Sequence, residues 1–227
     1  MNIRHTAATA PASAIGIRGL EINKTLRNTY ALLSLTLLFS AVVAGLSYAF
    51  NWPHPGLVIT LVGFYGLLFL TARLRNSAWG LLSTFALTGF MGLTIGPIIS
   101  AYVNALPNGG RLVMTALGGT GLIFLGLSAY ALVTRKNFSF IGGMLFTGIL
   151  TAFLLGLGAA IFSLPALSLA VSAMFILLMS GLILYQTSAI IHGGENNYIM
   201  ATVTLYVSIY NLFLSLLQLL GIFGGDD

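Results

Sequence analysis

The stretch that decides the fold is Tyr198 to Phe223, which reads YIMATVTLYVSIYNLFLSLLQLLGIF and contains no charged residue. An apolar run of this length crosses the roughly 30 Å hydrocarbon core of a bilayer as an α-helix. Similar runs precede it at Thr29–Phe50, Pro55–Ala72, Ala78–Val103, Leu112–Thr134, Phe138–Phe162 and Ala166–Ile191. The sequence therefore predicts an all-α integral membrane protein, a bundle of seven transmembrane helices.

Polar residues within the last run recur at steps of three and four residues. This spacing places them on one helical face, and that face should not meet lipid because unpaired polar groups there cost free energy. The residues are Thr204, Ser208, Asn211, Ser215 and Gln218. We therefore expect the last helix to be central in the bundle. The polar face is either a hydrogen-bonded packing seam or a polar conduit, and Gln186 and Thr187 of the sixth run are candidates to meet it.

Charged residues are scarce and lie between the runs. With 58% hydrophobic and 6% charged residues, the chain has too little polar surface for a soluble globule, so residues 29–223 form one transmembrane domain in the lipid bilayer. The basic loop residues set orientation and indicate no nucleic-acid site. If successive loops alternate between the two sides of the membrane, Arg111 is the only basic residue on one side. Arg73, Arg75, Arg135, Lys136 and the basic residues before Thr29 lie on the other side. This predicts a cytoplasmic amino terminus and residues 224–227 as a short end on the outer side.

Residues 1–28 are rich in Ala, Thr and Ser with scattered charge. Such a segment buries too little apolar surface to offset the entropy of ordering, so we expect a mobile cytoplasmic tail. The tail is either an inert leader or a handle for a cytosolic partner. It lacks the apolar core of a signal peptide, so the first run should act as an uncleaved signal anchor.

Catalytic and metal chemistry find little support in the residue types present. No Asp, Glu, Lys, Arg or His lies at mid-membrane depth, which disfavours a proton-driven transporter. Cysteine is absent, and the three histidines fall in separate segments where they cannot share a metal ion. We therefore expect no enzyme, no cofactor and no metal site.

Small residues recur four positions apart in two of the runs. Gly92 pairs with Gly96 in the third run, and Ala152, Gly156 and Ala160 follow one another in the fifth. This spacing lets helix backbones approach closely. We expect packing within the chain rather than a dimerisation face, and the oligomeric state stays open.

The most distinctive polar segment joins the last two runs and reads His192-Gly193-Gly194-Glu195-Asn196-Asn197. The glycines permit a sharp turn, while Glu195 and the asparagines can accept hydrogen bonds from the free amides of the next helix. Capping is one interpretation of the segment, and a partner-binding or gating role is the other.

Two motifs carry a resemblance to a known family. IIHGGENNY at Ile190–Tyr198, followed by Leu205-Tyr206 and Asn211-Leu212-Phe213, closely resembles the carboxy-terminal signature of the Bax inhibitor motif family. TFALTGFMG at Thr84–Gly92, followed by Gly96-Pro97-Ile98, is similar to the third-span motif of the same family. The likeness extends from about Leu26 to Gly221. Within the family the chain is most similar to bacterial members that modulate the membrane-anchored protease FtsH.

The resemblance implies a bacterial inner-membrane protein whose last helix is surrounded by the other six and whose carboxyl end is periplasmic. It also implies the FtsH complex as a partner and a regulatory role in membrane-protein quality control. The alternative that it implies is a calcium leak channel. Other members are described as such channels, in which an aspartate of the sixth helix pairs with one of the seventh and senses pH.

At the positions of that aspartate pair this chain has Gln186 and Ser208. Neither side chain titrates near neutrality, so the same pH latch cannot operate here. Calcium, which favours carboxylate ligands, would also lose its two best ones. The substitution therefore favours the regulator over the channel.

Overall fold

The computed structural model describes residues 12–224, and over that range the chain forms seven α-helices and one 3₁₀ turn. The helices are α1 (Ala12–Ala49), α2 (Leu57–Leu74), α3 (Ala78–Ala105), α4 (Gly109–Thr134), α5 (Gly142–Ile161), α6 (Pro165–Ile191) and α7 (Tyr198–Phe223), with the turn η1 (Ser139–Ile141) before α5. Each of the seven is long and apolar enough to cross a membrane. The predicted class, an all-α bundle of seven transmembrane helices, is confirmed.

Helix α1 starts well before the predicted first span. It begins at Ala12, and its membrane-spanning part is Glu21–Ala49. Residues 12–28, which we expected to belong to a mobile tail, therefore continue the first span as helix. No proline interrupts the chain between residues 12 and 52, so nothing in this stretch forces a helix to stop. The rest of the predicted tail, residues 1–11, lies outside the described residues.

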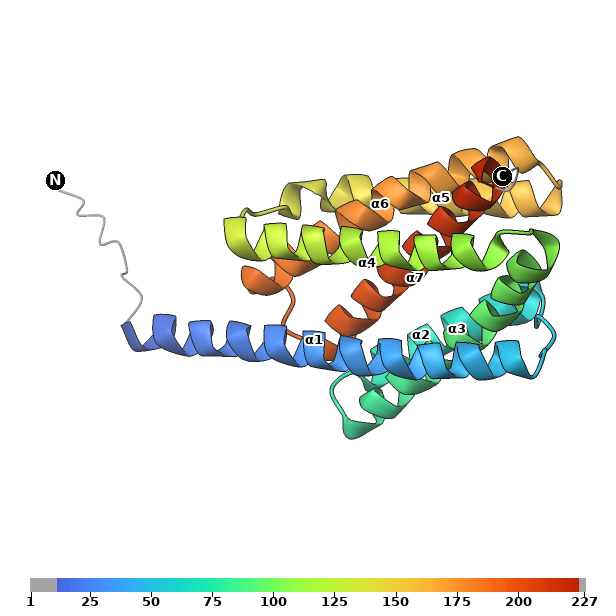
Figure 1. Ribbon diagram of the computed structural model, residues 1–227. Coiled ribbons are helices and arrows are strands. Elements are labelled where there is room, and N and C mark those ends of the chain that lie inside the picture. The colour runs from blue at the N-terminus through green and yellow to red at the C-terminus, as the bar shows by residue number, and fades with distance from the viewer. Residues whose placement is uncertain (1–11, 225–227) are drawn as a thin grey trace, which may run out of the picture.

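Two groups of three helices lie on either side of α7 (Figure 1). In one group α1 and α2 both pack on α3, and in the other α4 and α5 both pack on α6. Helix α7 crosses diagonally between the groups and packs mainly against α1, α3, α4 and α6. It supplies much of the core, including the fully buried side chains of Leu205, Leu212 and Leu217.

Glycines in α3 bring this helix against α1. A methyl group added at Gly92 would collide with the backbone oxygen of Ser40, and one added at Gly96 would lie 2.5 Å from the Cβ of Ser47. Small residues at these positions are what lets the two backbones approach. The small-residue pattern of the third run therefore serves packing within the chain.

The same contact compensates for a proline inside α3. Pro97 has no amide hydrogen, so it cannot donate to the carbonyl of Leu93 one turn earlier. The hydroxyl of Ser47 on α1 donates to that carbonyl at 2.9 Å. Because a free carbonyl inside a membrane bundle is costly, α1 stabilises α3 at the point where its own hydrogen bonding is interrupted.

Candidate functional site

Two polar side chains of α7 hydrogen-bond to backbone carbonyls of their own helix. The hydroxyl of Ser208 donates to the carbonyl of Thr204 at 2.8 Å, and the amide of Asn211 donates to the carbonyl of Val207 at 2.8 Å. Ser215, further along the same face, is buried. The hydroxyl hydrogen of Ser208 and one of the two amide hydrogens of Asn211 are used in this way, which leaves fewer donors for a polar conduit.

At its carboxyl end the polar face is bonded to α6. The side-chain oxygen of Gln218 accepts from the hydroxyl of Ser172 at 2.6 Å, and its amide donates to the hydroxyl of Ser168 at 2.6 Å. The sequence analysis did not select these two serines, although their spacing of four residues places them on one face of α6. Here the face acts as a packing seam.

Gln186 and Thr187, the candidates to meet this face, behave differently from each other. The hydroxyl of Thr187 lies 3.3 Å from that of Tyr30, so Thr187 bonds to α1 rather than to α7. Gln186 is 5% exposed, and its amide nitrogen has no hydrogen-bond partner among the described residues. The structure thus does not bond Gln186 to Ser208, and it leaves a buried donor on α6 unpaired.

Two tyrosines of α7, which the polar pattern did not include, bond directly to α1 and α3. The hydroxyl of Ser40 lies 2.5 Å from that of Tyr206, which in turn donates to the carbonyl of Thr88 at 3.2 Å. One turn later the hydroxyls of Tyr210 and Thr94 are 2.8 Å apart. The sequence signal for this pair is their spacing of four residues, which places both tyrosines on one face of the helix.

The segment between α6 and α7 is a tight turn that starts the last helix. Gly193 has φ +71°, a left-handed conformation that glycine adopts without strain. Asn197 is the N-cap of α7, and its side-chain oxygen accepts from the amide of Met200 at 3.0 Å. Glu195 in turn accepts from the amide of Asn197 at 2.8 Å, and His192 Nδ1 lies 2.8 Å from the carbonyl oxygen of Ser188.

Side chains at this turn also hold two other loops. The amide of Asn197 donates to the carbonyl of Arg75 at 3.1 Å and to the side chain of Asn76 at 2.9 Å. The hydroxyl of Ser188 donates to the carbonyl of Lys136 and accepts from the amide of Phe138, each at 3.0 Å. We call residues 75–76, 136–138, 188 and 192–197 the loop junction. It gathers the loops α2–α3, α4–α5 and α6–α7 at one end of the bundle.

The loop junction also gathers the basic residues of the loops. Arg73, Arg75, Arg135 and Lys136 lie exposed at this end. Arg111 lies at the start of α4 at the other end, where Asn108 donates to the carbonyl of Gly224 at 2.5 Å. The charge asymmetry expected from the sequence is therefore present in the folded bundle.

Replacing Asn197 by alanine is expected to lower the free energy of unfolding by about 1–3 kcal/mol, because it removes the cap and two bonds between loops. Thermal unfolding of the purified protein in detergent measures the effect. Asn196→Ala is the matched control, since that side chain is exposed. Equal melting temperatures for the two variants would contradict a clamping role for Asn197.

A family model described as inhibitor of apoptosis-promoting Bax1 matches residues 22–225, which include nearly all of the bundle. The chain belongs to the Bax inhibitor motif family. A protein of Escherichia coli K12 named modulator of FtsH protease YccA is 56% identical over 208 residues, which cover 91% of this chain and 94% of that protein. The YccA of a second E. coli strain, with the same identity and coverage, is named an inner membrane protein. An uncharacterised protein of Pseudomonas aeruginosa is 58% identical over 207 residues, 91% of this chain and 93% of that protein.

This Bax inhibitor motif protein has uncharged side chains at positions 186 and 208, where the resemblance implied an aspartate pair in other members. Gln186 offers an amide and Ser208 a hydroxyl, and neither ionises near neutral pH. Across residues 12–224, no three His, Asp or Glu side chains lie close enough together to share a metal ion. The side chains of Gln186 and Ser208 therefore offer hydrogen bonding by neutral groups.

Proposed function

We propose that this chain is an inner-membrane regulator, not an enzyme, which binds the FtsH protease and modulates it in membrane-protein quality control. The observation that carries the proposal is the 56% identity, over 91% of the chain, to the E. coli protein named modulator of FtsH protease. The name of the second E. coli protein supports the inner membrane as the location.

The bonding inside the bundle supports a regulator that acts through its surfaces. Ser208 and Asn211 bond to their own helix, and Gln218 bonds to two serines of α6. Most of the polar face that a conduit would need is thus occupied by structural hydrogen bonds. A regulator of a membrane-anchored protease needs only helix faces and loops that the partner can contact.

The positions of the charges support one orientation for this regulator. The basic loop residues lie together at the loop junction, and the positive-inside rule places that end in the cytoplasm. The amino terminus is then cytoplasmic and the carboxyl end periplasmic. Cysteines introduced singly at Asn76 and Asn108, which lie at opposite ends, would test the orientation through labelling by a membrane-impermeant reagent.

Co-purification tests the proposal directly. A tagged chain, solubilised from native membranes in mild detergent, is expected to retain FtsH, and its overproduction is expected to slow the turnover of a membrane substrate of FtsH. A second multi-spanning protein produced to the same level serves as the control for crowding of the membrane. Absence of FtsH from the purified material, together with unchanged turnover, would overturn the proposal.

Calcium flux distinguishes this function from the leak channel. The purified chain in liposomes that enclose a calcium-sensitive dye is expected to conduct no more calcium than empty liposomes at any pH between 6 and 8, about one unit either side of neutrality. A conductance that Ser208→Leu or Asn211→Leu abolishes would instead support a pore along α7. Such a result would contradict the regulator as the primary function.

A further inference from the structure

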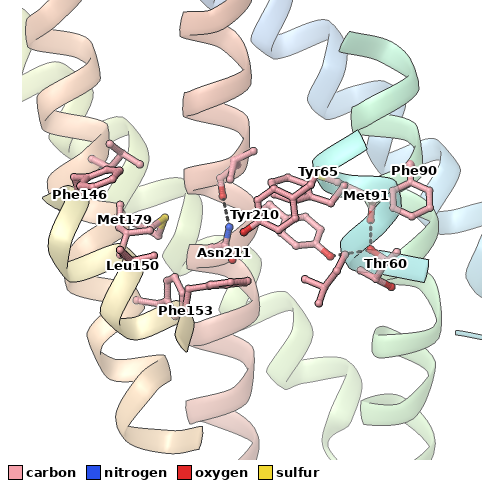
Figure 2. A pocket seen from close by; sticks show the side chains of 17 residues that line it. Thr60, Tyr65, Phe90, Met91, Phe146, Leu150, Phe153, Met179, Tyr210 and Asn211 are labelled. Atoms are coloured by element: carbon pink, nitrogen blue, oxygen red, sulfur yellow. Dashed lines mark hydrogen bonds between the residues drawn. The ribbon is translucent and has the colours of Figure 1, made fainter. Parts of the chain in front are cut away.

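A cavity of about 360 Å³ lies within the membrane-spanning part of the bundle (Figure 2). Helices α2, α3, α5, α6 and α7 all contribute to its lining, which contains no charged residue. Aromatic and aliphatic side chains dominate the wall, among them Phe90, Phe146 and Leu150. Pockets of this size with a mainly apolar lining are typical ligand sites in proteins.

Three of the few polar side chains in the wall are bonded within the protein. Tyr210 pairs with Thr94, and the amide nitrogen of Asn211 donates to its own helix. The hydroxyl of Thr60 has no hydrogen-bond partner among the described residues, but a single neutral hydroxyl cannot replace the hydration shell of a charged molecule. The cavity wall that a ligand would contact is mainly apolar.

The exposed residues of the wall belong to α2 and α5, so we infer that the cavity opens between these two helices, which do not pack closely against each other. Tyr65 of α2 meets Phe153 of α5 across this opening, with ring centroids 6.0 Å apart in an edge-to-face arrangement. Both residues lie near the middle of their helices, so the opening is at the depth of the hydrocarbon core. Tyr65, Phe146 and Leu150 are also exposed on the outer surface, where they meet lipid.

Size and charge decide between the candidate occupants. A transmembrane helix is about 10 Å in diameter and would need roughly 800 Å³ for each 10 Å of its length, so it does not fit in the cavity. A lipid headgroup or a cation would meet no opposite charge there. An acyl chain is slender and apolar, and it is the molecule that the opening faces in a bilayer.

We propose that this cavity binds one acyl chain of a membrane phospholipid, which enters between α2 and α5 past Tyr65 and Phe153. The lipid inserts from the side, and its headgroup stays outside the bundle. Tyr210 lines both this cavity and a second apolar cavity between α1, α3, α4 and α7, and the bound acyl chain ends at this tyrosine. The inference does not depend on binding to FtsH.

Photolabelling tests the site with the full-length protein. The chain is reconstituted in phosphatidylcholine vesicles that contain a phosphatidylcholine with a photoactivatable diazirine in its acyl chain, and labelled residues are mapped by mass spectrometry. Label is expected on Met91 and Met179, which line the cavity but are only 5% and 2% exposed. Leu177 on α6 is 75% exposed and reports contact with bulk lipid. Absence of label from both methionines, with Leu177 labelled, would overturn the proposal.

Variants of the cavity wall sharpen the test. Ile149→Trp fills the cavity and is expected to lower the labelling of Met179 relative to Leu177 at least fivefold. Leu122→Trp adds the same residue on the lipid-facing surface of α4 and is expected to leave this ratio unchanged. Phe153→Ala widens the opening and should raise the ratio, which keeps the site testable if the filled variant does not fold. A ratio that none of the wall variants changes would also overturn the proposal.

Discussion

Replacing Gly92 by leucine is expected to remove nearly all of the folded protein from the membrane. Even the first carbon of the new side chain would overlap the backbone oxygen of Ser40, and a backbone atom cannot turn aside as a flexible side chain can. Helices α1 and α3 would have to separate along a contact that also carries the bond from Ser47 to Leu93. Overpacking usually costs about 1–3 kcal/mol, and we expect the upper part of that range or more because two backbones collide.

Gly118→Leu is the matched control for this prediction. Gly118 lies in α4, and a carbon added there would have no atom of another helix within 4 Å, so the same change of residue is expected to cost little. Size-exclusion chromatography of fluorescent fusions in detergent measures the amount of folded protein for both variants. Equal, monodisperse peaks would show that α1 and α3 do not need this glycine.

Truncating Tyr206 is the second change with a large expected effect. Tyr206→Phe removes the hydroxyl that joins Ser40 to the carbonyl of Thr88, and it should lower the free energy of unfolding by about 1–3 kcal/mol. Tyr206→Ala also removes the fully buried ring and should cost about 3–5 kcal/mol in total. Thermal or denaturant unfolding in detergent measures both values.

The single variant Ser40→Ala and its combination with Tyr206→Phe show whether the Tyr206 hydroxyl stabilises the protein through its bond to α1. Ser40→Ala and Tyr206→Phe, combined, should cost less than the sum of the single changes, because the second change removes a bond that the first has already broken. Tyr65→Phe is the control, since this exposed tyrosine lies on the surface of the bundle. Full additivity would contradict a direct bond between Ser40 and Tyr206.

The fold was largely predictable because the membrane imposes a simple rule on sequence. Long uncharged runs must become helices, and their ends are marked by charge, proline and glycine, so the predicted runs agree with the helices to within a few residues for most of the chain. The exception is the start of α1. Composition indicated a tail before Thr29, whereas residues 12–28 contain no helix-breaking proline and continue the helix.

The polar contacts were only partly predictable. Capping by Asn197 follows from local sequence, since the residue stands directly before a helical run. The bonds of Tyr206 to Ser40 and Thr88 join residues more than 100 positions apart, which periodicity within one helix cannot identify. Tyrosine is also ambiguous in a membrane sequence, because it suits both the interface and a buried hydrogen bond.

The loop junction has a consequence for how the protein is made. Asn197 hydrogen-bonds to the loop α2–α3, and Ser188 hydrogen-bonds to the loop α4–α5. Each residue follows its loop by 50 residues or more in the chain. The loops α2–α3 and α4–α5 are therefore synthesised before the residues that hold them. We therefore expect the loop junction to form last, and the earlier helices to depend until then on their contacts with one another.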